Sequence, residues 1–419
     1  MSFKRSLGFA EFLCLGINCV VGTGIFLIPA LVYKNLGPSG IVAYLVCGTL
    51  CMFIGLCFCE MSGRFEKTGG AALYAGETLG PLMGFLVGWQ MWLSSLVGWA
   101  SVARGFYFYW RALVPPLFPH DDIALLVIII AGLSALNYRG VKMGSRVSDF
   151  FALSKLVPLL LFLAAGLFCM KSQNFVPFFR GALPEWGAAL VVVFYAFTGF
   201  EEISLPAAEG KDPRKDVPRA LLFVLGGASI IYMLVQTVTT GVFQGLASSE
   251  KPLSDAAFQC MGRPGEVFVA LGALLSIGGI NSAIALTGPR ALYTLAASGF
   301  LPRWLTVLHR SHGTPGRAIV VNSVLTFALA ATGTFEVLLK LSVLAALWQH
   351  LPTCIAVLVA RKKFAEPSAF TIPGGPVVPL CAVLICIVLV SQVEPLNILW
   401  SIVGLAAGLP LYLYFSRVS

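Results

Sequence analysis

The most informative segment of this chain is Gly16-Ile17-Asn18-Cys19-Val20-Val21-Gly22-Thr23-Gly24-Ile25-Phe26. It lies inside the first long apolar segment and places glycines where a membrane-spanning helix should be continuous. Lipid cannot satisfy free N–H and C=O groups, so irregular backbone at membrane depth is tolerated only where it is buried in protein or lines a cavity. The stretch therefore predicts a broken helix and a place where a ligand meets backbone.

The composition indicates an all-α polytopic membrane protein. Of 419 residues, 58% are hydrophobic and 11% are charged, whereas an average globular domain has about 25% charged residues. The first apolar run lacks a small-residue cleavage pattern, so we expect it to be retained. About twelve runs are long enough to span a bilayer, at 9–32, 39–60, 82–112, 122–138, 148–170, 185–208, 219–243, 265–298, 318–333, 335–360, 376–393 and 396–415.

The distribution of charge predicts the topology. Lysine and arginine gather in alternate loops, and the positive-inside rule then places the N- and C-termini in the cytoplasm and the chain in the cell membrane. The net charge of +9 is scattered over short loops with no motif to present it, so we expect the lipid bilayer and no nucleic acid as a partner. The eleven cysteines lie mainly in spans, and their spacing predicts no metal site and no disulfide framework.

A second break is expected in the sixth apolar run. It reads Val193-Phe194-Tyr195-Ala196-Phe197-Thr198-Gly199-Phe200-Glu201-Glu202, so a glycine and two carboxylates enter an apolar helix. Gly-interrupted segments at equivalent positions of two halves are typical of inverted-repeat secondary transporters, whose substrate site lies between the broken helices. The alternative is that the glycines only allow close helix packing.

The ends of broken helices have a definite chemistry. The half-helix that begins near Gly22 has free N–H groups and a partial positive charge, which suit a carboxylate. The half-helices that end near Val20 and Ala196 present free carbonyls, which suit an ammonium group. A site with both features fits the zwitterionic part of an amino acid and needs no charged side chain.

These residues also resemble a known family. Gly22-Thr23-Gly24-Ile25-Phe26 is similar to the Gly-Ser/Ala-Gly-Ile-Phe motif in span one of the amino acid, polyamine and organocation superfamily of permeases. One departure is Thr198, where relatives often have glycine. Further stretches resemble the family in the same order over nearly the whole chain, namely 60–70, 196–201 with 209–220, 290–302 with 314–315, and 370–376.

The resemblance implies about twelve transmembrane helices in a LeuT-type 5+5 inverted repeat with broken helices 1 and 6, plus two C-terminal helices. The repeats are expected at 1–170 and 171–363, and the added helices at 364–419. The resemblance also implies that Tyr195 is an aromatic gate. It implies a binding site in which N–H groups hold the substrate carboxylate and carbonyls hold its amine, with the residues Val20, Gly22, Thr23, Gly24, Tyr195, Ala196 and Thr198.

Lys155 is the most informative single charge. It lies about a third of the way into the fifth apolar run, where an ionisable group costs several kcal/mol unless it faces a partner or a cavity. Snorkelling toward the interface is the alternative. The resemblance implies that its ammonium replaces a sodium ion against the broken span one, so that Lys155 either couples transport to protons or acts as a fixed cation.

Other polar residues allow plainer interpretations. Glu201 is expected to orient its helix from behind the site, as an alternative to carrying a proton. Asn281 and Ser282 either face the lysine and the break or make interhelical hydrogen bonds. Snorkelling explains Arg104, and His350, with no carboxylate near it in sequence, is expected to be a core residue. Candidates for the substrate side-chain pocket on span three are Trp89, Gln90, Trp92, Ser94 and Ser95.

The function that these features predict is secondary active transport of amino acids. No acid lies among the pocket candidates, which favours neutral L-amino acids. The resemblance implies alternating access, and the possible coupling through Lys155 favours proton symport. An amino acid exchanger and a polyamine or cationic amino acid transporter are the alternatives. An enzyme would need a convergent cluster of titratable residues, and a channel would need charge rings or filter loops. The sequence shows neither, so no catalytic residue, metal or cofactor is expected.

Overall fold

The computed structural model describes residues 7–139, 145–309 and 311–415, and of 145–154 the helical backbone alone. Within these ranges the chain is helical apart from its loops and a single β-bridge between Leu7 and Gly210. The α-helices are α1 (Phe9–Val20), α2 (Thr23–Leu36), α3 (Gly40–Ser62), α4 (Gly70–Leu79), α5 (Pro81–Leu113), α6 (Asp121–Tyr138), α7 (Ser145–Cys169), α8 (Leu183–Phe197), α9 (Pro213–Val242), α10 (Pro252–Ala297), α11 (Gly316–Thr332), α12 (Phe335–Lys363), α13 (Val377–Ser391), α14 (Pro395–Ala406) and α15 (Gly408–Phe415).

Short 3-10 helices connect several of the longer elements. The one that matters for the site is η3 (Phe200–Ser204), which follows α8 directly. The others are η1 (Gly37–Ser39), η2 (Ser172–Phe175), η4 (Ala207–Glu209), η5 (Leu246–Ser248) and η6 (Arg303–Thr306).

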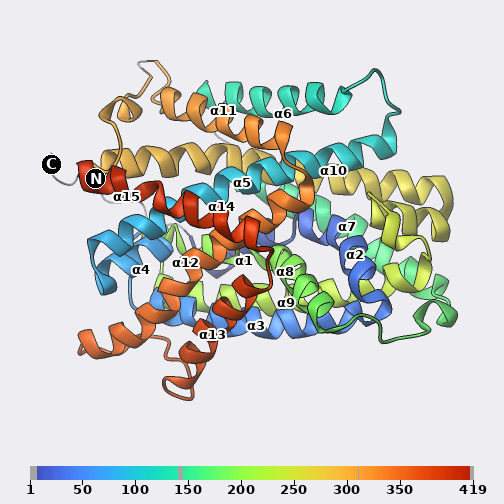
Figure 1. Cartoon of the computed structure of the whole chain (residues 1–419), viewed down its shortest axis with the longest axis horizontal. Coiled ribbons are helices and arrows are strands. Elements are labelled where there is room, and N and C mark those ends of the chain that lie inside the picture. The colour runs from blue at the N-terminus through green and yellow to red at the C-terminus, as the bar shows by residue number, and fades with distance from the viewer. Residues whose placement is uncertain (1–6, 140–144, 310, 416–419) are drawn as a thin grey trace.

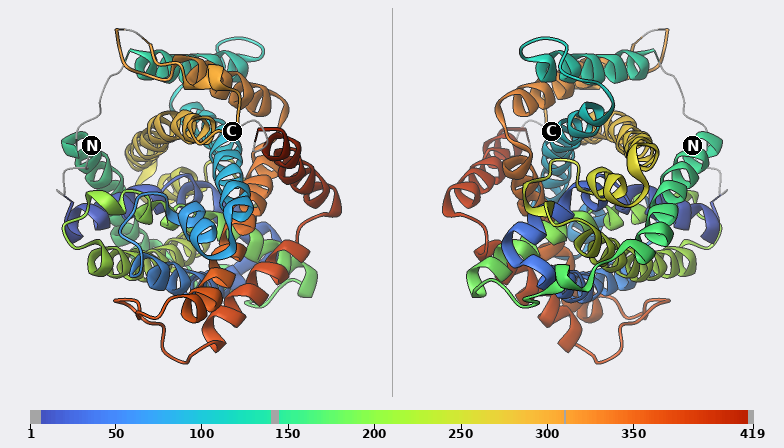
Figure 2. Two further views of the ribbon diagram at one scale, coloured as in Figure 1. Left: turned by 90° about the vertical axis from the view of Figure 1, so that its left-hand side faces the viewer. Right: turned by 90° about the vertical axis from the view of Figure 1, so that its right-hand side faces the viewer.

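Most of the long helices run along one direction, as the end-on views show (Figure 2). The helices α6 and α11 lie together along one edge and α13 lies at the opposite edge, with α1 and α8 between them (Figure 1). In the core, α3 packs against α8 and α9, α2 against α8, and α5 against α10 and α12. The two interrupted segments, α1–α2 and α8–η3, are therefore surrounded by other helices.

A helix occupies each range that the sequence marks as apolar. Seven helical segments among the described residues are long and apolar enough to cross a membrane, and four more apolar helices are shorter. Large apolar side chains are exposed on the outer helices, such as Leu161 of α7, Leu384 of α13 and Trp400 of α14, as lipid contact requires. The chain is a multi-pass membrane protein, while the number of crossings and the repeat stay predictions.

Three features differ from the sequence expectations. The helix α4 lies between the apolar runs predicted at 39–60 and 82–112, in a range where no helix was predicted. Cys169 and Cys260 form a disulfide that joins α7 to α10, although their spacing of 91 residues matches no pattern. Arg104 does not snorkel: it pairs with Asp122 of α6 at 2.7 Å and donates to the carbonyls of Ala330 and Ala331 at the end of α11.

Candidate functional site

The first apolar segment is broken where the glycine motif lies. The helix α1 ends at Val20, α2 begins at Thr23, and Val21 and Gly22 are not helical. Among the described residues, no side chain caps the start of α2, so its first N–H groups are available to bind a ligand. The buried hydroxyl of Thr23 also has no hydrogen-bond partner in that part of the chain. These groups form a set of donors directed at the break.

The sixth apolar segment is broken as well. The helix α8 ends at Phe197, and the chain passes through Thr198 and Gly199 before η3 begins. Gly199 has φ +104°, a conformation that costs glycine little and other residues much. The hydroxyl of Thr198 donates to the carbonyl of Tyr195 at 2.7 Å. The last carbonyls of α8 thus lie at the break.

The two breaks touch each other. A Cβ atom built on Gly24 would lie 2.7 Å from the Cα of Ala196, and one built on Gly199 would lie 2.7 Å from the carbonyl oxygen of Cys19. Both distances are shorter than an ordinary carbon contact, so only glycine permits this approach. The first N–H groups of α2 and the last carbonyls of α1 and α8 consequently border one place.

Tyr232 of α9 connects the carbonyls of both breaks. Its hydroxyl lies 2.7 Å from the oxygen of Val20 and 2.9 Å from that of Ala196, and its side chain is fully buried. A hydroxyl has one proton to donate, so the two carbonyls share a single donor. Tyr232 could not be predicted from the sequence, because one tyrosine in an apolar helix carries no distinguishing signal.

Lys155 contacts the end of α1 directly. Its Nζ lies 2.8 Å from the carbonyl oxygen of Val21, 3.0 Å from that of Asn18 and 3.4 Å from that of Ile17. The residue is 2% exposed, which excludes snorkelling. A cationic side chain at the negative end of a helix is in a favourable position, so the ammonium group holds the break in span one from the side of α7.

Tyr195 closes one side of the place where the breaks meet. It is buried, its hydroxyl donates to Ser101 of α5 at 3.2 Å, and its ring packs edge-on against Phe335 of α12. Three helices therefore meet at this aromatic residue. Glu201 lies behind the break on η3, where its carboxylate accepts from the N–H of Gly199 at 3.0 Å.

Comparison with known proteins identifies the family of this chain. A family model described as amino acid permease matches residues 7–412. The chain belongs to the amino acid permease family. It is 29% identical to the branched-chain amino acid permease BcaP of Bacillus subtilis over 99% of this chain and 94% of the relative.

Other relatives of the permease are also transporters. It is 28% identical to the methylthioribose transporter of Bacillus subtilis, over 99% of this chain and 94% of that one. It is 25% identical to the serine/threonine exchanger SteT of the same organism, over 91% and 89% of the two chains. The family and these relatives make the permease a transporter and not an enzyme.

The residues expected to line a side-chain pocket on span three lie away from the breaks. At the level of the breaks, α5 presents Ser101 to Tyr195 and Gly105 to Thr23. Trp89 lies twelve residues before Ser101, which is about 18 Å along a helix; its indole N–H donates to the carbonyl of Gly404 in α14. Trp92, three residues further along α5, donates its indole N–H to Asn322 of α11. The place of Gln90, Ser94 and Ser95 in a side-chain pocket stays a prediction.

Asn281 and Ser282 lie on α10. The amide of Asn281 donates to the carbonyl of Ile277 in its own helix at 3.0 Å. Asn281 also borders an open, mostly apolar depression of about 480 Å³ between α5, α6 and α10, together with Phe106 and Gly278. Ser282 follows Asn281 on the same helix, and a role of either residue beside the lysine and the break stays a prediction.

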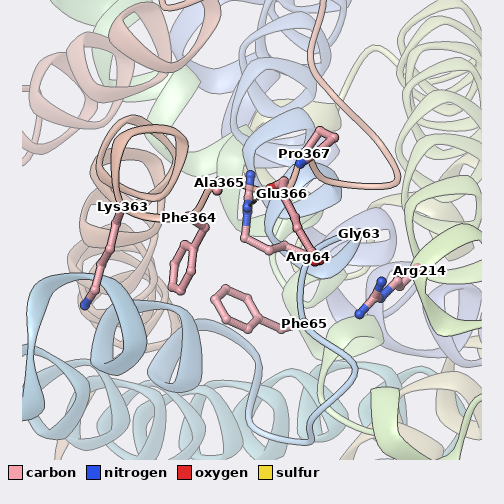
Figure 3. Close-up of a pocket in the computed structure, with 9 residues that line it drawn as sticks. All are labelled: Gly63, Arg64, Phe65, Arg214, Lys363, Phe364, Ala365, Glu366 and Pro367. Atoms are coloured by element: carbon pink, nitrogen blue, oxygen red, sulfur yellow. Dashed lines mark hydrogen bonds between the residues drawn. The ribbon is translucent and has the colours of Figure 1, made fainter.

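A separate pocket of about 320 Å³ lies where α3 and α12 end (Figure 3). Three cationic side chains surround two phenylalanine rings there, but each cation has a protein partner. Arg64 donates to the carbonyl of Glu366, Arg214 pairs with Glu66 at 3.0 Å, and Lys363 donates to the carbonyl of Glu77. Nearby, Arg361 binds the buried carboxylate of Glu60 through two nitrogens. The interactions around this pocket hold the helix ends together.

Proposed function

We propose that this permease is a secondary active transporter that moves neutral L-amino acids across the cell membrane by alternating access, with proton symport. The observation that carries the proposal is the contact between the two breaks through Gly24 and Ala196. It brings backbone donors and backbone acceptors to one buried place, which is the pattern that an α-amino and an α-carboxylate group require.

Each half of the amino acid has a defined binding partner in this proposal. The carboxylate accepts from the first N–H groups of α2 at Gly22, Thr23 and Gly24. The ammonium group donates to the carbonyls of Val20 and Ala196, with Tyr195 and Thr198 beside them. The shared hydroxyl of Tyr232 supports this assignment, because one donor leaves acceptor capacity on two carbonyls and an ammonium group has three donors.

The preference for neutral substrates follows from the carboxylates near the breaks. Glu201 already accepts from the N–H of Gly199 and from Gln349, so it is engaged in holding the backbone and is not directed at a ligand. Relatives named a branched-chain permease and a serine/threonine exchanger support the same class. The exchanger also favours a second mode, in which one amino acid must leave for another to enter.

Lys155 is the ion-coupling residue of the proposal. Its ammonium group supplies the positive charge against the carbonyls at the end of α1, and loss of its proton would weaken that hold on the break. The two repeats at 1–170 and 171–363, the added helices at 364–419 and the cytoplasmic position of both termini complete the arrangement that alternating access requires.

A thermal-shift panel of the twenty amino acids on purified permease tests the substrate class, because a ligand that binds the native state stabilises it. We expect branched-chain or small neutral amino acids to give the largest shifts. Uptake into proteoliposomes then separates the modes: a pH gradient alone drives a symporter, whereas an exchanger needs amino acid on the opposite side. Shifts with cationic amino acids or methylthioribose alone would overturn the neutral class.

A further inference from the structure

A buried carboxylate and a buried histidine face each other behind the break in span six. The Nε2 atom of His350 on α12 lies 3.5 Å from Oε2 of Glu201 on η3. The other carboxylate oxygen accepts from Nε2 of Gln349 at 3.1 Å. His350 is fully buried and Glu201 is 6% exposed, so water does not compensate a charge on either group.

Charge balance requires a proton in this cluster. Among the described residues, no lysine or arginine pairs with Glu201, and His350 is the basic side chain that faces it. A carboxylate left unpaired at membrane depth costs several kcal/mol. The cost is removed when one proton is shared by the pair, either on the imidazole, which makes an ion pair, or on the carboxyl group.

The surroundings leave His350 without another polar partner. Its ring packs against Phe58 of α3, Phe194 of α8 and Phe200 of η3, with centroid distances of 5.2–6.0 Å. Neither ring nitrogen makes a conventional hydrogen bond within the described part of the chain. The contact with Glu201 is therefore the one that a change in the protonation of His350 alters most.

Other titratable groups surround the pair, and the experiment must separate them from it. Glu202 follows Glu201 on η3, and Lys155 on α7 is directed at the carbonyls of α1. The thiols on the helices around the pair are Cys19 of α1, Cys51 and Cys57 of α3, Cys354 of α12 and Cys386 of α13.

The pair connects two points at which the chain can bend. On one side is the break at Gly199, which precedes η3. On the other side is Pro352, inside α12 two residues after His350, and a proline removes one helical hydrogen bond and weakens the helix there. The start of α12 also carries Phe335, which packs against Tyr195. Movement of α12 at this level would thus reach the gate.

We propose that Glu201 and His350 form a proton-binding site that fastens α12 to the broken span six and releases α12 when the proton leaves. The inference rests on the proposed transport function and adds to it a second proton site, apart from Lys155. The protonated pair attracts, so α12 is held against η3. The deprotonated pair leaves a carboxylate facing a neutral ring, so that α12 is held to η3 at this point only by the hydrogen bond from Gln349.

The test compares wild type with His350→Gln, which keeps a polar side chain that does not titrate. Exchange of a mixture of radiolabelled L-leucine, L-valine, L-serine and L-threonine is measured in proteoliposomes with equal pH on both sides, so no proton gradient drives it. We expect the wild-type rate to change about threefold or more between pH 5.5 and 7.5, the range of histidine. His350→Gln should exchange at a rate that is nearly constant over this range.

Three further variants complete the test, and the first of them is a control. His312→Gln changes an exposed loop histidine and should keep the wild-type profile, whereas Glu201→Gln should flatten it. A wild-type profile in His350→Gln, or a profile flattened by Glu202→Gln instead, would overturn the proposal and leave amino acid transport intact.

Thermal unfolding gives a readout that does not depend on transport. The difference in unfolding temperature between wild type and His350→Gln should be largest at low pH, where the imidazole is charged, and should shrink as pH rises. A difference that is independent of pH would also overturn the proton site. Failure of wild type to exchange any amino acid would instead count against the proposed function.

Discussion

Replacing Gly24 with alanine tests the contact on which the binding site depends. The new Cβ atom would lie 2.7 Å from the Cα and 2.9 Å from the Cβ of Ala196, whereas carbon atoms in contact are normally about 3.5–4.0 Å apart. The atoms that the new Cβ meets are the Cα and Cβ of Ala196, which cannot move without the backbone. The two half-helices must therefore separate by about 1 Å. Overpacking of this kind typically costs about 1–3 kcal/mol.

The expected functional result is larger than the expected loss of stability. A displacement of about 1 Å in a preorganised site can cost about 100-fold in rate, so uptake by Gly24→Ala should fall by about that factor. The assay is uptake of the best-shifting neutral amino acid into proteoliposomes, with thermal unfolding to verify that the variant is folded.

A matched control comes from the same chain. A Cβ atom on Gly226 in α9 would meet no atom within 4 Å, and alanine is favoured over glycine in a helix by about 1 kcal/mol. Gly226→Ala should therefore transport like wild type. If Gly24→Ala keeps wild-type uptake and apparent affinity, the argument that the two breaks form one site is refuted.

Three further variants test other parts of the site and the fold. Lys155→Met removes a charged donor worth about 1.5–3 kcal/mol per hydrogen bond, so uptake should fall at least about tenfold; unchanged uptake and pH dependence would contradict its coupling role. Tyr232→Phe leaves two buried carbonyls without their donor, at about 1–3 kcal/mol, so the unliganded protein should melt earlier and gain more from saturating substrate than wild type does, and equal gains would argue against the amine site. Arg361→Gln leaves the buried carboxylate of Glu60 without its cationic partner, which should lower the free energy of unfolding by about 3–5 kcal/mol. Adding Glu60→Gln should partly restore the stability; additive losses in melting temperature would speak against the pair.

The two helix breaks and the buried position of Lys155 were predictable from the sequence. Glycine motifs around Gly22 and Gly199 interrupt apolar runs, and both breaks are present in the structure. The depth of Lys155 in its apolar run excluded an ordinary loop position, and the structure places its ammonium group on α1. Such features depend on local sequence, which is why they are readable without coordinates.

Contacts between distant helices were not predictable in the same way. Which face of α9 carries Tyr232 toward the breaks depends on how α9 packs, and nothing in its own sequence specifies that. His350 is a buried core residue, as expected, but its contact with Glu201 could not be predicted, because Glu201 is far away in sequence and 3.5 Å away in space. The position of Trp89 relative to the breaks could not be predicted, because apolar periodicity does not show at which depth in the bundle a residue of α5 lies.

The contact between Gly24 and Ala196 also bears on how the protein is made. During synthesis, α2 is complete long before α8 leaves the ribosome, so the binding site cannot exist until the later segment has inserted and docked. A substrate that spans both breaks then stabilises only correctly assembled molecules. Supplying that amino acid in the growth medium should raise the cellular level of weakly folded variants, because the substrate stabilises the transporter that binds it.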